Sequence, residues 1–182
     1  MSGKIDFQSL SFGMRRIGWI RFWVQSILGV VVMAVLIFSN FVSDSEDKFN
    51  LNAGLSLTTI SFILLLFSIW QGWLIIRTGR AIASNARPSR GQTSKLIKRG
   101  ILNDLLGILF GLIGNQTLIG ILFLQSTSEK NVVGSINSNY DVTGLEIFSV
   151  LSNCQVIFAH FLGLCFSLWL LRRIYKLIFD FR

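Results

Sequence analysis

Long apolar runs dominate the pattern of hydrophobic and polar positions along this chain. The four runs are Phe22 to Val42, Leu55 to Ile76, Ile101 to Leu124 and Leu145 to Leu171. As a helix, each is long enough to cross a hydrocarbon layer of about 30 Å, which needs roughly 20 residues. The runs are nearly unbroken, so no polar face is set aside for water. The pattern predicts an all-α integral membrane protein, with four transmembrane helices in a single membrane domain over residues 1–182.

The segments before and between the runs indicate how the bundle is organised. In residues 7–21, Leu10, Met14 and Ile17 recur at helical spacing with arginines interleaved. This spacing fits a short amphipathic helix lying on the inner face of the membrane, and it equally fits an extension of the first transmembrane helix. Residues 77–100 form the longest polar stretch beside the spans and contain the only proline, Pro88. We expect them to form a basic inner loop.

The distribution of positive charge predicts the topology. Fifteen of the 17 Lys and Arg residues precede the first run, lie between the second and third, or follow the fourth. Only Lys48 and Lys130 lie in the other two loops, which also carry acidic residues. Because Lys and Arg mark the side that is not translocated, we expect both termini and the central loop inside. All five tryptophans, which favour the headgroup level, lie near the inner ends of the runs.

Composition narrows the function classes. Hydrophobic residues make up 52% of the chain and charged residues 14%, against about 25% charged in an ordinary soluble domain. No aromatic stacking platform accompanies the positive charges, which argues against nucleic acid as a partner. We expect the basic segment to contact anionic headgroups or an acidic protein. Its candidate contact residues are Arg87, Arg90, Lys95, Lys98 and Arg99. No catalytic motif occurs, so we expect no enzyme.

Small residues in the third run form a stripe. Gly100, Asp104, Gly107, Gly111 and Gly114 recur at steps of three or four, so they share one helix face. Such a surface lets another helix approach closely, within the bundle or in a homo-oligomer. The predicted helix-packing glycines are Gly107, Gly111, Gly114 and Gly163. We expect Asp104, near the start of the run, to pair with Arg172 or Arg173.

A second face, on the fourth run, carries Ser149, Asn153, His160, Gly163 and Ser167. Counted from the ends of the runs, His160 should lie within one helical turn of Gln116 in depth. The predicted polar seam comprises His160, Asn153, Gln116 and Asn115. His160, the only histidine, is expected either to hydrogen-bond to a neighbouring helix or, on weaker grounds, to ligate a metal. Cys154 and Cys165 should point to other faces.

Several segments resemble a known family. They are FGMRRIGWIRFW from Phe12, ARPSRG, GILNDLLGILFGLIGNQTLIGIL from Gly100, and HFLGLCFSLWLLRR from His160. Together they are similar to the permease-in-chloroplasts family, four-span proteins of the chloroplast inner envelope with cyanobacterial homologues. The resemblance implies a cyanobacterial plasma or thylakoid membrane, or a plastid inner envelope. It implies iron import or a part in protein import.

Two functional hypotheses follow from these observations. The first is a small permease or transport subunit for iron or another metal ion, which would pass along the polar seam. The metal would be cargo rather than a bound cofactor, and the protein would work as a homo-oligomer. The second is a non-transporting component of a protein translocon or a membrane-complex assembly factor. Cation carriers normally need acidic residues deep in the membrane, and their expected absence here favours the second hypothesis.

Overall fold

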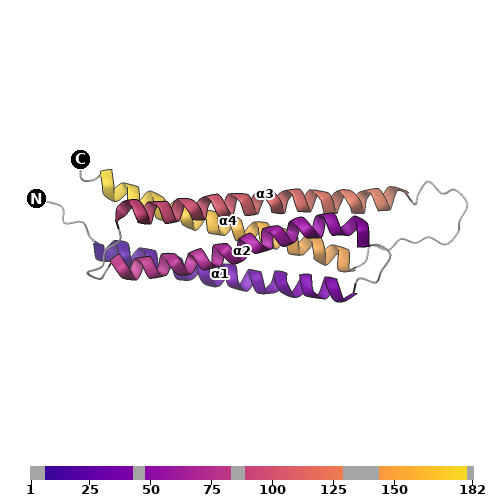
Figure 1. Cartoon of the computed structure of the whole chain (residues 1–182), viewed down its shortest axis with the longest axis horizontal. Helices are drawn as coiled ribbons and strands as arrows, with labels where there is room; N and C mark the ends of the chain where they lie inside the picture. The colour runs from indigo at the N-terminus through magenta and orange to yellow at the C-terminus, as the bar shows by residue number, and fades with distance from the viewer. Residues whose placement is uncertain (1–6, 43–47, 83–88, 129–143, 180–182) are drawn as a thin grey trace, which may run out of the picture.

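The computed structural model describes residues 7–42, 48–82, 89–128 and 144–179, which form four helices and no strand. The helices are α1 (Phe7–Val42), α2 (Lys48–Ile82), α3 (Arg90–Ser128) and α4 (Gly144–Phe179), and successive helices run antiparallel (Figure 1). Each contains a segment long and apolar enough to cross a membrane. The prediction of an all-α, four-span membrane protein is therefore confirmed.

The helices extend well beyond the apolar runs. They contain 36, 35, 39 and 36 residues, which is about 52 to 58 Å at 1.5 Å per residue and exceeds a hydrocarbon layer of about 30 Å. Helix α1 is continuous from Phe7, so residues 7–21 extend the first transmembrane helix. Much of the predicted basic inner loop is also helical, because α2 continues to Ile82 and α3 begins at Arg90.

A side-chain cap explains where α3 begins. The Ser89 hydroxyl accepts a hydrogen bond from the Gln92 backbone N–H at 3.2 Å, and the Gln92 side-chain oxygen accepts one from the Ser89 N–H at 3.1 Å. This reciprocal capping box satisfies two backbone donors that the first helical turn leaves without partners. The helix therefore begins eleven residues before the apolar run does, while its sequence is still polar.

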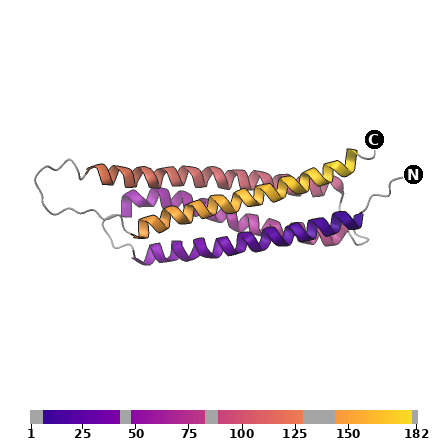
Figure 2. The same cartoon turned by 180° about the vertical axis from the view of Figure 1, so that it is seen from behind.

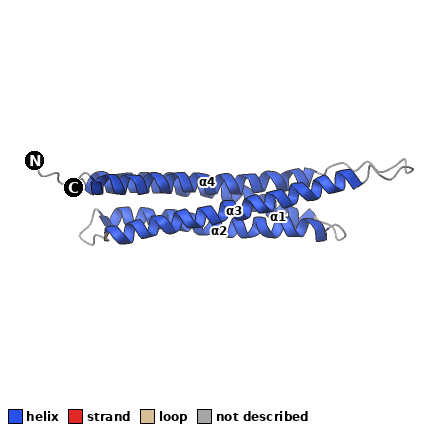
Figure 3. Ribbon diagram, turned by 90° about the horizontal axis from the view of Figure 1, so that it is seen from above, coloured by secondary structure: helices blue, strands red, loops and turns tan. Residues whose placement is uncertain are grey.

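The four helices form a ring in which each packs against the next and α4 closes against α1 (Figures 2 and 3). Helices α1 and α3 face each other diagonally, and among the described residues their backbones do not come close. The start of α1, the end of α2, the start of α3 and the end of α4 lie together at one end of the bundle. We call this the basic end, because its exposed side chains include Arg15, Arg16, Arg77, Arg80, Lys95, Lys98, Arg99 and Arg172.

Two apolar clusters pack the interior, with polar side chains between them. The cluster toward the basic end comprises Met14, Ile75, Ile82, Ile97, Leu170 and Ile174. The cluster toward the opposite end comprises Val32, Phe62, Leu65, Val156 and Ala159. Most large apolar side chains point outward instead, including Trp23, Leu109 and Phe161, as expected where the solvent is lipid. The buried layer between the clusters is polar and ionic.

The glycine stripe of α3 packs inside the bundle. A Cβ at Gly107 would collide with the His160 ring, and one at Gly111 would lie 2.7 Å from a side-chain carbon of Ile157. Gly114 is buried as well, and a Cβ at Gly163 would collide with the Gln25 amide. The sequence left open whether this stripe packs within the bundle or against a second copy of the chain. In the structure it packs against α4 of the same chain.

Candidate functional site in the buried polar layer

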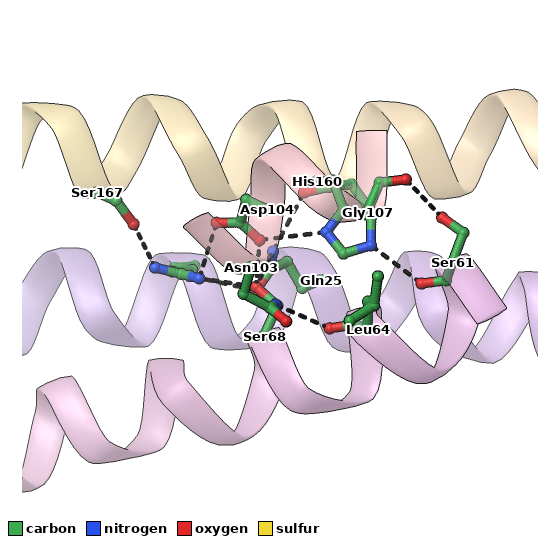
Figure 4. Close-up of polar contacts among 11 residues, drawn as sticks. Gln25, Ser61, Leu64, Ser68, Asn103, Asp104, Gly107, His160 and Ser167 are labelled. Carbon is green, nitrogen blue, oxygen red and sulfur yellow. Dashed lines mark hydrogen bonds and ion pairs between the residues drawn. The ribbon is translucent and has the colours of Figure 1, made fainter. Parts of the chain in front are cut away.

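Arg21 is the centre of the polar layer, and its partners Ser68, Asp104 and Ser167 are labelled in Figure 4. Its side chain is fully buried, although the residue directly precedes the first apolar run in the sequence. Its guanidinium donates to Ser167 of α4 at 2.5 Å, to Ser68 of α2 at 2.7 Å and to Asp104 of α3 at 3.0 Å. One arginine thus contacts the other three helices, and it joins the diagonal pair α1 and α3.

Asp104 is the acidic partner, and it is also fully buried. Its Oδ2 accepts from Arg21, while its Oδ1 accepts from the Ser68 hydroxyl at 2.6 Å and lies 3.2 Å from Nδ1 of His160. The prediction that Asp104 pairs with Arg172 or Arg173 is therefore wrong. Asp104 lies on the interior face of α3, whereas Arg172 points outward from α4. Both carboxylate oxygens are engaged inside the bundle.

His160 lies on the side of Asp104 away from the basic end. Its Nε2 is 3.1 Å from the backbone carbonyl oxygen of Ser61, and the Ser61 hydroxyl donates to the Gly107 carbonyl at 2.8 Å. The ring occupies the space that Gly107 leaves open on α3. A neutral imidazole ring carries one N–H and a cationic ring carries two. Here each ring nitrogen faces an oxygen atom: Nδ1 faces the Asp104 carboxyl group, and Nε2 faces the Ser61 carbonyl, which can only accept a hydrogen bond.

Amide side chains complete the layer. Gln25 donates from its side-chain nitrogen to the Ser68 hydroxyl at 2.9 Å and to the Ala159 carbonyl at 3.2 Å. Its oxygen accepts from Nε of Arg21 at 3.3 Å. Asn103 donates to the Leu64 carbonyl at 3.0 Å. Buried polar groups are costly unless they are hydrogen-bonded, and these contacts supply the partners that lipid cannot.

Surface residues indicate the depth of the layer in the membrane. A Cβ at Gly100 would lie 3.5 Å from the Arg21 guanidinium, so Arg21 is level with the neighbouring Arg99, which is exposed. Trp23, Trp70 and Trp169 are about half exposed close to the same level. Exposed arginine and half-exposed tryptophan are typical of the headgroup region. Arg21 thus lies near that boundary, and His160, seven residues along α4 from Ser167, lies about 10 Å deeper.

The structure brings together only part of the predicted polar seam. His160 and Asn153 are buried on one face of α4, and Asn115 is half-buried and accepts from the Cys154 thiol at 3.9 Å. Gln116 is exposed on the outside of the bundle. His160 is level with Gly107, nine residues or about 13 Å from Gln116 along α3. The predicted depth was wrong because Ser167, not Leu171, is level with Gly100, so the inner ends of the two runs do not coincide.

Asn153 is fully buried, and neither its amide nitrogen nor its amide oxygen has a hydrogen-bond partner among the described residues. The buried hydroxyl of the adjacent Ser152 likewise has no hydrogen-bond partner among the described residues. Asn153 shares a helix face with His160, seven residues and about 10 Å farther from the basic end. An unpaired buried amide costs stability, so this residue extends the polar face of α4 toward the opposite end without strengthening the bundle.

The predicted lipid or partner contacts divide into three groups. Lys95, Lys98 and Arg99 are exposed on the first turns of α3. Arg90 is the first residue of α3, and Arg87 lies outside the described residues. The three exposed side chains could reach headgroups or another protein at the basic end.

Metal ligation rests on few groups. In the part of the chain that the structure describes, no three His, Cys, Asp or Glu residues lie together as a metal site. Cys154 and Cys165 are exposed free thiols, which agrees with their expected separation from His160. Asp104 and His160 are the two adjacent side chains that offer a carboxylate oxygen and an imidazole nitrogen, the types of ligand that suit iron and similar ions.

Sequence reasoning missed Arg21, Gln25, Ser61 and Ser68. Arg21 was counted among the basic residues outside the first span, because a charge next to an apolar run usually marks its end. The spacing of polar residues was a usable signal. Arg21 and Gln25 are four residues apart and share one face of α1, while Asp104 shares a face of α3 with Gly100 and Gly107. Two helices with polar groups at matching depth indicate a shared buried layer, but only knowledge of the helix neighbours pairs them.

Comparison with known proteins now identifies the family. A model described as protein of unknown function (DUF3611) matches residues 5–175. The chain belongs to the DUF3611 family. The chain is also similar in sequence to Protein TIC 21, chloroplastic, of Arabidopsis thaliana, with 30% identity over 165 residues. The match covers 88% of this chain and 56% of TIC 21, so the chain spans about half the length of that relative.

These matches confirm the resemblance to the permease-in-chloroplasts family, of which TIC 21 is a member. The DUF3611 chain is thus an integral membrane protein related to a chloroplast protein. No solved structure matches it.

Proposed function

We propose that this DUF3611 protein is a small permease, or the transport subunit of one, for iron or another divalent metal ion. The observation that carries the proposal is Asp104, a carboxylate buried between Arg21 and His160 inside a membrane-spanning bundle. Ionisable residues within membrane spans are expensive and typically mark ion pathways or proton relays. Asp104 lies only four residues, or about 6 Å, along α3 from Gly100, so this acidic group is close to the basic end of the bundle.

The arrangement of the polar side chains supports a path along α4. Ser167 is closest to the basic end, His160 follows about 10 Å deeper, and Asn153 lies about 10 Å beyond His160. The first two belong to the connected polar layer, and the third offers an amide without a partner among the described residues. Oxygen and nitrogen donors thus recur at intervals of about 10 Å along one face of α4. Asp104 and His160 would hold it most strongly.

The remaining parts of the proposal come from the family and from the charge pattern. The relative TIC 21 is a chloroplast protein, and the family has been assigned iron import or a part in protein import. We place this chain in a plastid inner envelope or a cyanobacterial membrane, with the basic end and both termini on the stromal or cytoplasmic side. In this proposal the protein catalyses no reaction and has no resident cofactor, since the metal is cargo.

The test is metal uptake by the purified protein in sealed vesicles. We expect Asp104→Asn and His160→Ala to reduce uptake of Fe²⁺ or Mn²⁺ by at least about tenfold, because each removes one ligand of the buried pair. Cys165→Ser, an exposed position five residues from His160 on the same helix, is the matched control and should retain uptake. Folded variants that transport as well as the wild type would refute the permease.

A second candidate function is membership of a larger membrane complex, such as a protein translocon. It is favoured by the outer face of α3, where Gln116 presents an amide toward lipid and Gly120 has nothing within 4 Å of a Cβ position. A polar amide beside a small residue promotes helix association in membranes, in a homo-oligomer or with another protein. Gln116→Leu should weaken co-purification of a second copy or a partner while the bundle stays folded, and unchanged co-purification would argue against this face.

A further inference from the structure

The Tyr175 hydroxyl joins α4 to α3 at the surface of the basic end. It makes side-chain hydrogen bonds with Ser94 and with Lys98, both on α3. An ammonium group can only donate, so the Tyr175 oxygen accepts from Lys98. Lys98 is exposed, Ser94 is half-buried and Tyr175 is 38% exposed. Two hydroxyl groups and a cation thus meet where α3 and α4 adjoin, and they face the surroundings of the bundle. We call these three side chains the α3–α4 junction.

The charge around the α3–α4 junction is positive. Asp104 and Glu146 are the acidic residues in the part of the chain that the structure describes. Asp104 is buried, and Glu146 lies at the start of α4, at the opposite end of the bundle. Among the described residues, Lys98 therefore has no carboxylate near it at the basic end. The exposed side chains of Lys95 and Arg172 add two further positive charges on the same parts of α3 and α4, so this surface is suited to an anion.

The α3–α4 junction lies at the depth of lipid headgroups. Ser167 is level with Gly100, so Trp169 and Lys98, each two residues closer to the basic end, are level with each other. Trp169 is 44% exposed, as is typical of tryptophan in the headgroup region. From Lys98 to Ser94 the rise along α3 is about 6 Å, and the headgroup layer is roughly 5 to 8 Å thick on each side of the hydrocarbon. The hydroxyl and ammonium groups therefore lie where lipid phosphates lie.

Apolar side chains continue the same two helix faces into the hydrocarbon. On α3, Leu102 and Leu105 follow Lys98 at steps of four and three residues. On α4, Leu168 and Phe161 precede Tyr175 at steps of seven residues. All four apolar side chains are exposed. A polar, positively charged group at headgroup depth is thus followed by an apolar surface directly below it, which matches the two parts of a phospholipid.

We propose that the α3–α4 junction binds the phosphate group of an anionic glycerophospholipid, whose acyl chains lie on the apolar faces below. The Lys98 ammonium and the two hydroxyl groups donate to the phosphate oxygens. A zwitterionic lipid carries its own cation beside the phosphate, which the positive surface repels. An acidic protein segment would offer carboxylates but nothing to cover the apolar faces, so a lipid fits better. This inference needs no transported ion and goes beyond the permease proposed above.

The test is thermal unfolding of the purified protein in a mild detergent, titrated with phosphatidylglycerol as the anionic probe and with phosphatidylcholine as its zwitterionic match. A ligand that binds only the folded state raises Tm as its concentration increases. We expect phosphatidylglycerol to raise Tm at concentrations at which phosphatidylcholine does not. Inorganic phosphate, which offers the same oxygen acceptors without acyl chains, should give no rise at those concentrations. An equal rise with phosphatidylcholine, or a rise with inorganic phosphate alone, would overturn the proposal.

Two variants locate the lipid on the protein. Tyr175→Phe keeps the ring and removes the hydroxyl, so it should weaken phosphatidylglycerol binding about fivefold at low salt and equally in 0.5 M salt, because a neutral hydrogen bond is lost. Lys98→Gln should weaken binding by a similar factor, but mainly at low salt, because salt screens the charge that it removes. Arg80→Gln is the matched control: it removes an exposed cation of the same basic end from α2 and should leave the affinity unchanged.

The Tm of Tyr175→Phe without added lipid should equal that of the wild type, because this side chain lies at the surface, and this check separates lost binding from lost folding. Phosphatidylglycerol affinity that is unchanged in Tyr175→Phe would overturn the site. Equal losses in all three variants would also overturn it, since they would indicate diffuse attraction to the basic end. Poly-glutamate that binds the wild type and loses affinity in Tyr175→Phe, while phosphatidylglycerol does not, would assign the junction to an acidic protein instead.

Discussion

The ion pair between Arg21 and Asp104 makes a quantitative prediction about stability. Asp104→Asn keeps the shape of the side chain but removes its charge. Arg21 would retain hydrogen bonds to Ser167, Ser68 and Gln25, yet its positive charge would be buried without the opposite charge at 3.0 Å. The pair spans the diagonal of the bundle, where α1 and α3 have no close backbone contact among the described residues.

The expected magnitude follows from these contacts. Removing one partner from a buried ion pair costs about 3–5 kcal/mol, because the remaining charge stays desolvated. For a chain of this length, 1 kcal/mol corresponds to about 2–4 °C in Tm, so Asp104→Asn should lower Tm by about 6–20 °C. Arg21→Gln should have a cost of the same order. The double variant Arg21→Gln/Asp104→Asn has no buried charge at either position, so it should be more stable than either single variant.

The assay is thermal unfolding in a mild detergent, followed by the fluorescence of the tryptophans, with a double-mutant cycle over the four proteins. A coupling free energy of about 2 kcal/mol or more is expected for groups in direct contact. Exposed ion pairs typically contribute no more than about 1 kcal/mol. A coupling free energy above that value would therefore indicate that the pair is buried. Additive costs, with the double variant the least stable, would refute the reasoning and would indicate that water reaches this layer.

Other positions give sharper single tests. Gly107→Ala should destabilise the bundle by about 1–3 kcal/mol, since the added methyl group collides with His160. Gly120→Ala on the same helix has open space and should leave Tm unchanged or slightly higher in the same measurement. Asn153→Leu should raise Tm, because it removes an amide that is buried without a partner among the described residues, while lowering metal uptake; lower Tm would show that the amide is satisfied. Lys98→Gln should weaken binding of detergent-solubilised protein to anionic lipid by about 1 kcal/mol, or roughly fivefold, and an effect that persists in 0.5 M salt would count against electrostatic attraction.

The sequence by itself determined the number of spans, the all-helical class and the faces of α3 and α4 on which small and polar residues gather. Continuous apolar runs of this length cross lipid as helices, because a helix satisfies its backbone polar groups within its own segment. Glycine and polar residues at steps of three or four then define a face whatever the neighbours are. The stripe from Gly100 to Gly114 and the face from Ser149 to Ser167 both lie buried in the structure.

Only the tertiary structure decided which polar groups meet. Pairing depends on which helices are neighbours and on their relative shift along the axis, and a shift of a few residues changes every contact. The inner ends of the apolar runs gave the wrong shift, which placed His160 beside Gln116 instead of Gly107. The pairing of Arg21 is likewise visible only in the structure. Its long side chain reaches Asp104 across the diagonal of the bundle, and no pattern within α1 specifies a partner on α3. Local periodicity fixes a face, whereas packing of four helices fixes the site.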